Sequence, residues 1–223
     1  MNLEIDKTVE TLKKEGFILI PEFYDHKFCD LAVSEIENAI AVRKKNINEF
    51  IGGGGDIRFF KFENVSKTAS KFGSNSIISE ILSVYFTKKV KTHFVLAGKL
   101  EASTSNLSAN SGGDWHRDSD LKQVKAMIYL NDVDEKNGPF IFLQNSKNIY
   151  PKRDKMIFNN SFVYYLKKLL RTFKIKEPRY SSSIINNRIE ENKLSSIEIT
   201  AKKGALILFD SSYIHKGKII EKG

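Results

Sequence analysis

The chain has 223 residues, of which 41% are hydrophobic and 11% aromatic, which is enough apolar material for the core of one globular domain. It contains no run of 18 or more apolar residues and no basic-then-apolar N-terminus, so we expect neither a transmembrane helix nor a signal peptide. The single cysteine, Cys29, excludes an internal disulfide and predicts a cytoplasmic protein. The net charge of +9 raises the question of nucleic-acid binding.

Six elements are predicted in residues 1–102. The apolar spacing predicts helices over residues 5–15, 26–43 and 74–87 and short strands over residues 17–20, 56–62 and 91–102. Gly16 fits the C-terminal stop of the first helix, and Asp25 and Ser74 fit the N-terminal caps of the other two.

Three features of this region could be taken for functional sites, but each lacks a residue or partner that such a site needs. Gly52–Gly55 lacks the Gly-Lys-Ser/Thr ending of a phosphate loop and is predicted to be a flexible turn. His93 lies on a separate predicted strand without a carboxylate partner, so we interpret it as a strand residue and not as a metal ligand. Cys29 falls in the second helix, where a buried and inert thiol is expected.

The stretch Asn110–Ser119 carries the main chemical signal of the chain, a His-x-Asp pair at His116 and Asp118. Side chains two apart on a strand point to the same face, so this imidazole and this carboxylate could hold one ion. A second histidine, His215, follows the predicted strand 205–209 about a hundred residues later. Two histidines and one carboxylate on one ion form the facial triad of non-haem Fe(II) oxygenases, which leaves other positions open for further ligands.

Further strands are predicted around these ligands. The runs 123–133 and 140–143 flank the turn signal Asn137–Pro139 and are predicted to pair as a hairpin. The runs 198–200 and 205–209 resume the strand pattern before the second histidine.

Residues 147–195 interrupt the strand pattern with a basic insertion. A helix is predicted over residues 156–173 and a polar loop over residues 181–187. From Lys147 to Lys193 the chain carries twelve Lys and Arg against four Asp and Glu, a balance of +8, so nearly all the excess positive charge lies here. Such an insertion is a usual place for a lid or a substrate-recognition element, and a solvated basic face is the alternative.

These segments resemble the phytanoyl-CoA dioxygenase family. The resemblance is carried by Gly113–Ser119, by Gln123–Val133 with Glu135–Phe140, and by Gly204–Gly217. It covers most of the chain and is weak between about residues 147 and 195. It implies a mainly β fold with flanking helices, in which a double-stranded β-helix (a jelly roll, or cupin-like barrel) carries the site.

The resemblance also implies a division of the chain. Residues 1–223 would form a single oxygenase domain, in which residues 1–88 support the barrel. Residues 89–146 and 196–223 would form the barrel itself, and residues 147–195 would be a lid-like, helical insertion.

The same resemblance implies an enzyme in which His116, Asp118 and His215 bind Fe(II), with 2-oxoglutarate and O2 as co-substrates and ascorbate as a supporting reductant. Oxidative decarboxylation of 2-oxoglutarate would then drive hydroxylation of an unactivated C–H bond. Related halogenases have a small residue at the position of Asp118, so a carboxylate there favours hydroxylation. Trp115 and Arg117 would point away from the metal and have packing or supporting roles.

One departure from the family pattern concerns 2-oxoglutarate. The family binds its distal carboxylate with an arginine about ten residues, a strand's length, beyond the second histidine, and this sequence ends before that position. Three explanations stay open: the sequence stops short of the arginine, which the run Ile219–Gly223 favours; Lys218 or Lys222 replaces it; or 2-oxoglutarate is not used. Gln123 and Lys125, on the strand after the ligands, are further co-substrate candidates.

The leading hypothesis is therefore a dioxygenase that hydroxylates a small or carrier-linked molecule, and the basic insertion favours a substrate with phosphate or carboxylate groups. The alternative is a non-catalytic jelly-roll protein that binds a metal or an acidic ligand. Nucleic-acid binding is disfavoured, because the aromatic residues of the predicted helix 156–173 fall on the side expected to be buried. No membrane partner is expected, and the sequence does not indicate an oligomeric state.

Overall fold

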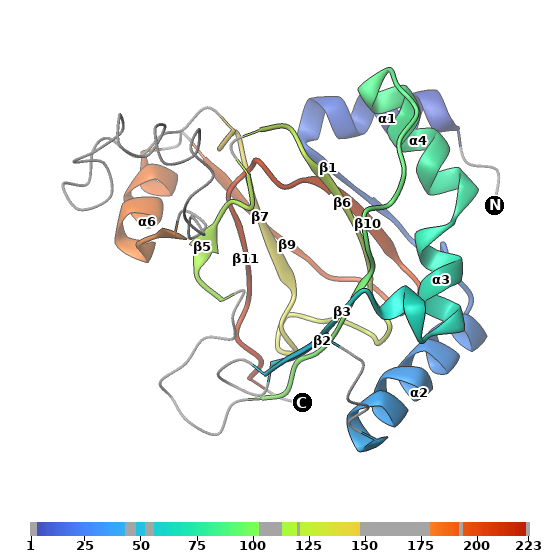
Figure 1. Ribbon diagram of the computed structural model, residues 1–223. Coiled ribbons are helices and arrows are strands. Elements are labelled where there is room, and N and C mark those ends of the chain that lie inside the picture. Colours follow the sequence, from blue (N-terminus) through green and yellow to red (C-terminus); the bar gives the residue numbers. More distant parts are fainter. Residues whose placement is uncertain are drawn as a thin grey trace, which may run out of the picture.

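Two antiparallel sheets pack against one another and form the core of the protein (Figure 1). The computed structural model describes residues 4–42, 48–51, 56–102, 113–119, 121–147, 179–191 and 194–221. The mainly β, jelly-roll architecture that the sequence predicts is confirmed.

The smaller sheet of the barrel has the strand order β1-β10-β6, and the larger sheet has the order β8-β5-β11-β7-β9. The bounds of these strands are β1 Phe17–Ile20, β5 Trp115–His116, β6 Val124–Ile128, β7 Phe140–Gln144, β8 Arg179–Tyr180, β9 Ser195–Ile199, β10 Leu206–Asp210 and β11 His215–Gly217. A third, separate sheet has the order β2-β3-β4, with bounds β2 Asn48–Ile51, β3 Ile57–Phe60 and β4 Leu96–Lys99.

The core lies between the two barrel sheets, whose inner faces are apolar. Phe140 and Phe142 of β7 meet Ile207 and Phe209 of β10 in one buried cluster. Because side chains alternate along a strand, the residues between these point to the outer faces of the sheets, where they need cover of their own.

Helices provide that cover on both sides. Helices α1 (Ile5–Glu15) and α4 (Ser76–Phe86) pack on the smaller sheet, where Leu206 and Leu208 are fully buried. Helix α6 (Ser182–Glu190) packs on the larger sheet through Ile185. In Figure 1 the N-terminal helices and α6 lie on opposite sides of the barrel. Helix α2 (His26–Val42), the 3-10 turn Phe62–Asn64 and helix α3 (Lys67–Gly73) pack against the third sheet.

The predicted N-terminal elements are largely confirmed. Helix α1 has the predicted bounds, and Gly16 follows it with a left-handed backbone at φ 82°. Asp25 caps α2, since its Oδ1 accepts a hydrogen bond from Phe28 N at 2.7 Å. The predicted helix 74–87 begins later, at Ser76, because Asn75 caps it while Ser74 closes the preceding helix α3. The sequence patterns did not reveal α3 or β2.

Two predictions in the second half of the chain are wrong. Strands β6 and β7 do not form a hairpin, because β6 pairs with β10 whereas β7 pairs with β11 and β9. The connection between them instead crosses from one sheet to the other. The Tyr129 hydroxyl stabilises this connection by accepting a hydrogen bond from Phe140 N at 2.9 Å.

The predicted polar loop 181–187 is instead the start of helix α6, which Ser181 caps. The predicted helix 156–173 lies outside the described residues.

Among the helices that the structure describes, none combines the length and the hydropathy that a membrane crossing requires.

The turn at Gly204 brings the start of β10 close to the chain that precedes α2. Its backbone is left-handed, with φ 90°, and its carbonyl accepts a hydrogen bond from Tyr24 N at 3.0 Å. A Cβ atom at this position would lie 2.1 Å from the Tyr24 carbonyl oxygen, so no side chain fits without movement of the main chain.

We expect Gly204→Ala to destabilise the fold by about 2–3 kcal/mol, because the change combines a strained backbone with a clash against main chain. In a domain of this size, that lowers Tm by roughly 5–10 °C, which calorimetry can measure. Gly98→Ala is the matched control, since a Cβ there would make only ordinary contacts, the nearest at 3.7 Å. Equal shifts in the two variants would contradict this account.

Candidate metal centre

His116, Asp118 and His215 meet at one site on the barrel, although about a hundred residues separate the two histidines in the sequence. His116 ends β5 and His215 begins β11, and the two are direct partners in the strand register. Their rings lie 4.5 Å apart, and Asp118 Oδ2 lies 3.3 Å from His215 Nε2. One possible ligand atom from each side chain lies within 4.8 Å of the other two.

Main-chain carbonyl groups orient both imidazole rings. His116 Nδ1 lies 2.7 Å from Asp114 O, and His215 Nδ1 lies 2.9 Å from Tyr213 O. A carbonyl oxygen can only accept a hydrogen bond, so each Nδ1 donates to its carbonyl, which leaves Nε2 as the ring atom that can bind a metal ion. This is the usual arrangement of imidazoles that bind metal ions in proteins.

Asp118 is held as a carboxylate. Its side chain is 10% exposed, and among the described residues no hydrogen bond of normal geometry reaches its Oδ2, although Lys125 Nζ lies 2.8 Å away. Burial favours the neutral acid, but His215 and Lys125 outweigh it and hold the pKa of Asp118 well below its usual range. Asp118 Oδ2 and His215 Nε2 lie 3.3 Å apart, so one cation can be bound by both atoms. The donor set therefore fits a divalent metal ion bound by two nitrogens and one oxygen.

The sequence as a whole agrees with this site. It matches the family described as Phytanoyl-CoA dioxygenase (PhyH) over residues 12–219. The chain belongs to this family. It is therefore a non-haem iron dioxygenase that uses 2-oxoglutarate, as the sequence resemblance predicts. No curated protein matches the chain.

Several solved structures share the fold of this dioxygenase. The epimerase SnoN, in complex with Fe3+, alpha ketoglutarate and nogalamycin RO, has a TM-score of 0.67 at 11% identity, covering 98% of this chain and 78% of SnoN. HygX from Streptomyces hygroscopicus, with nickel and 2-oxoglutarate bound, has a TM-score of 0.61 at 15% identity, covering 97% of this chain and 81% of HygX. EctD from S. alaskensis, with 2-oxoglutarate and 5-hydroxyectoine, has a TM-score of 0.65 at 12% identity, covering 99% of this chain and 74% of EctD. At these identities the similarity establishes a common fold.

A polar turn after β10 ties the two ligand segments of the dioxygenase together. Asp118 N donates a hydrogen bond to Ser211 O at 3.1 Å, and Ser211 N donates to Gln123 O at 2.7 Å. The fully buried carboxylate of Asp210 organises the turn, since its Oδ1 accepts from Ser212 Oγ at 2.7 Å and from Ser212 N at 3.1 Å. Sequence patterns did not identify Asp210, Ser211 and Ser212 as part of the site, although three polar residues directly after an apolar strand are a visible signal.

Aromatic side chains line the inner side of the metal centre. The rings of Phe140 and Phe209 lie 5.4 Å and 5.3 Å from the ring of His215. Both phenylalanines are buried, so they exclude water from this side of the ligands.

The two co-substrate candidates near β6 differ in their contacts. Lys125 pairs with Phe209 across the smaller sheet, so both side chains face the barrel interior. Its Nζ lies 2.8 Å from Asp118 Oδ2, and its side chain is 47% exposed. Gln123 Oε1 instead accepts a hydrogen bond from Ser211 Oγ at 3.2 Å, which supports the polar turn. Of these two side chains, only Lys125 therefore contacts a member of the triad directly.

Lys218 lies on the other side of the larger sheet. Side chains alternate along β11, so Lys216 and Lys218 point away from the face that carries His215. Lys216 Nζ lies 4.6 Å from the centre of the Trp115 ring, and Lys218 Nζ forms a 2.9 Å ion pair with Glu198. The structure does not bring Lys218 to the metal ligands, and Lys222 lies outside the described residues.

The other candidates of the sequence analysis lie apart from the metal centre. His93 is exposed and precedes β4, so its interpretation as a strand residue is wrong. Cys29 is buried, as predicted. Gly52–Gly55 lies outside the described residues.

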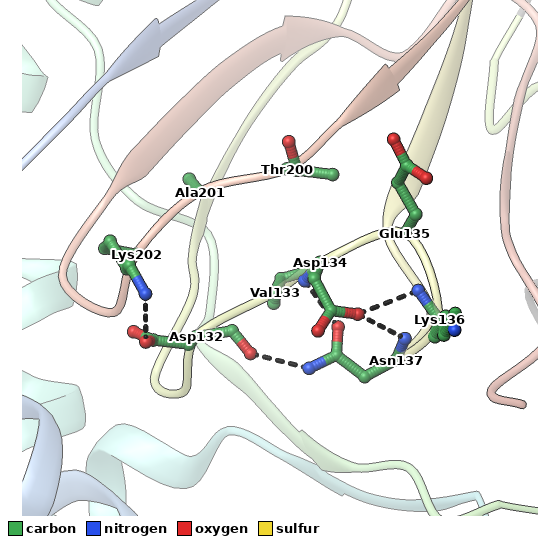
Figure 2. Close-up of a pocket in the computed structure, with 9 residues that line it drawn as sticks. All are labelled: Asp132, Val133, Asp134, Glu135, Lys136, Asn137, Thr200, Ala201 and Lys202. Carbon is green, nitrogen blue, oxygen red and sulfur yellow. Dashed lines mark hydrogen bonds and ion pairs between the residues drawn. The ribbon is translucent and has the colours of Figure 1, made fainter. Parts of the chain in front are cut away.

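A surface pocket lies at the other end of the barrel strands (Figure 2). It is lined by residues 132–137 and 200–202, next to the end of β10 that is remote from the polar turn. Its polar groups bond to one another: Asp134 Oδ1 accepts from Lys136 N at 2.8 Å, and Asp132 forms a 2.8 Å ion pair with Lys202. We therefore assign this pocket no part in the chemistry at the triad.

Asp210 should make the stability of the fold sensitive to acid. Burial raises its pKa, but the hydrogen bonds from Ser212 and the ammonium group of Lys147 outweigh burial, so the pKa lies below its ordinary value. Such a carboxyl group stabilises the fold above its unfolded pKa of about 3.9, and this contribution is lost as the pH falls through the lower folded pKa. Asp210→Asn should therefore have a lower Tm than wild type at about pH 7 and should lose less Tm between about pH 7 and pH 3.

Calorimetry over this pH range measures both effects. Asp132→Asn is the control, because Asp132 is 56% exposed and its ion pair with Lys202 lies at the surface. Its Tm should follow that of wild type at each pH. Parallel Tm curves for wild type and Asp210→Asn would contradict the role given to the buried carboxylate.

Proposed function

We propose that His116, Asp118 and His215 bind Fe(II) and that the dioxygenase hydroxylates an unactivated C–H bond of a small or carrier-linked, anionic substrate. The triad itself carries this proposal: two oriented imidazoles and a buried carboxylate offer ligand atoms within 4.8 Å of one another. Three protein ligands leave coordination positions for 2-oxoglutarate and O2. The carboxylate of Asp118 supports hydroxylation over halogenation, because it takes the position that a halide would need.

The residues of the chain have separate tasks in this reaction. Bound Fe(II), together with 2-oxoglutarate and O2, supplies oxidising power that no side chain has. The triad holds the metal, and the carbonyl groups of Asp114 and Tyr213 keep the imidazoles in their binding orientation. Phe140 and Phe209 exclude water from the inner side of the centre, which protects a reactive site from solvent.

Charge supports an anionic substrate. The stretch from Lys147 to Lys193, which lies in sequence between the two ligand segments, has a balance of +8. Lys125 adds an ammonium group directly beside the ligand Asp118. The solved structures of SnoN, HygX and EctD contain nogalamycin RO, hygromycin B and 5-hydroxyectoine, which supports a small molecule as the substrate here.

Turnover is the direct test. The purified protein would be loaded with Fe(II), supplied with ascorbate and 2-oxoglutarate, and offered CoA thioesters, nucleotide-linked sugars and phosphorylated metabolites. We expect succinate, and a product that carries one added oxygen atom in its mass spectrum. His215→Ala should lower Fe(II) affinity by roughly 100-fold or more and abolish succinate formation. His93→Ala, which removes an exposed histidine, should match wild type.

Two results would count against the proposed function. One is a wild-type protein that makes no succinate with any substrate of the panel. The other is a His215→Ala variant that binds Fe(II) as tightly as wild type.

We also propose that Lys125 binds a carboxylate group of 2-oxoglutarate. A hydrogen bond to a charged group contributes about 1.5–3 kcal/mol, so Lys125→Met should raise the KM for 2-oxoglutarate about 10- to 100-fold. Lys218→Met is the matched control, because its ammonium group is paired with Glu198 away from the triad, and its KM should equal that of wild type. If only Lys218→Met raises the KM for 2-oxoglutarate, then Lys218, and not Lys125, binds its carboxylate group.

A further inference from the structure

Arg117 stands in the sequence between the two ligands His116 and Asp118, but its side chain serves a different part of the fold. It is 1% exposed, which is rare for an arginine. Its guanidinium donates hydrogen bonds to two successive main-chain carbonyls, from Nη1 to Lys147 O at 3.1 Å and from Nη2 to Ser146 O at 2.7 Å. Burying a charged group costs several kcal/mol unless hydrogen bonds compensate for the lost water. The hydrogen bonds to the two main-chain carbonyls therefore allow the guanidinium to be buried here.

The same stretch of chain also holds the second histidine. Ser146 is fully buried, and its Oγ accepts a hydrogen bond from Ile214 N at 2.7 Å, directly before His215. The Ser146 hydroxyl in turn donates to Leu143 O at 2.6 Å, and Leu143 N donates to Ile214 O at 3.0 Å. The end of β7 is therefore bonded to the segment that carries each of the two histidines.

We propose that Arg117 and Ser146 form a clamp that sets the separation between the His116–Asp118 segment and His215, and so the shape of the metal centre. They are positioning residues, since they act through the backbone next to the ligands and not on the metal itself. Strand β5 has only two residues and meets β11 at a single residue pair, so the strand ladder alone gives this separation little support. The clamp adds hydrogen bonds between buried groups behind the two strands. This inference rests on the metal centre proposed above.

Co(II) is the probe that tests the clamp, because its visible absorption reports the number and geometry of its ligands independently of turnover. We expect wild type to bind Co(II) at the triad and Arg117→Met to bind it about 10- to 100-fold more weakly, with an altered Co(II) spectrum. Arg117→Lys should recover part of the affinity, because an ammonium group can reach one of the two carbonyls. Arg188→Met is the matched control, since Arg188 lies on α6 and pairs with Glu191, and its spectrum should equal that of wild type.

A second variant keeps the test decisive if Arg117→Met does not fold. Ser146→Ala removes the hydroxyl that holds Ile214 and should change affinity and spectrum in the same direction. Where both single variants fold, the double variant should lose less affinity than the sum of the two, because both act on one clamp.

The clamp would be overturned by folded variants that lower Tm but keep the wild-type Co(II) affinity and spectrum. That result would make Arg117 a purely structural residue. If wild type binds Co(II) no more tightly than His215→Ala does, the proposed metal centre itself is contradicted, and not the clamp alone.

Discussion

The architecture of this dioxygenase depends on one constraint: two imidazoles and a carboxylate from distant parts of the chain must face the same point. His116 and Asp118 come from one edge region of the larger sheet, and His215 comes from the strand beside it. A site of this kind must be preorganised, so the protein needs contacts that hold the three side chains close together before a metal ion binds. It does so with main-chain hydrogen bonds from the polar turn at Asp210–Ser212 and with buried polar side chains behind the site.

The two faces of the larger sheet carry different kinds of side chain. Its inner face carries the imidazoles and a set of phenylalanines, while its outer face packs Trp115 and Ile141 against α6. Alternation along β11 places His215 on the inner face and Lys216 on the outer face. A lysine can reach the triad only from the inner face, and this criterion favours Lys125 of the smaller sheet over Lys218.

The sequence alone singles out the candidate ligands, because residue chemistry and local spacing point to the same residues. The His-x-Asp pair and the later histidine stand out because few residue sets can bind a metal, and the outward direction of Trp115 follows from simple alternation. Alternation does not, however, identify the partner of a strand. The runs that became β6 and β7 flank a strong turn signal, yet the chain between them crosses from one sheet to the other. The contacts of Arg117 and Asp210 join residues far apart in sequence, and no local pattern encodes such pairs.

The most direct test of the central claim is a crystal structure of the Fe(II)-loaded protein, prepared without oxygen and measured on both sides of the iron absorption edge. We expect a single anomalous peak within bonding distance of His116, Asp118 and His215, with both Nδ1 atoms still directed at the carbonyl groups of Asp114 and Tyr213. An iron peak at any other place, or one that lacks His215 as a ligand, would contradict it.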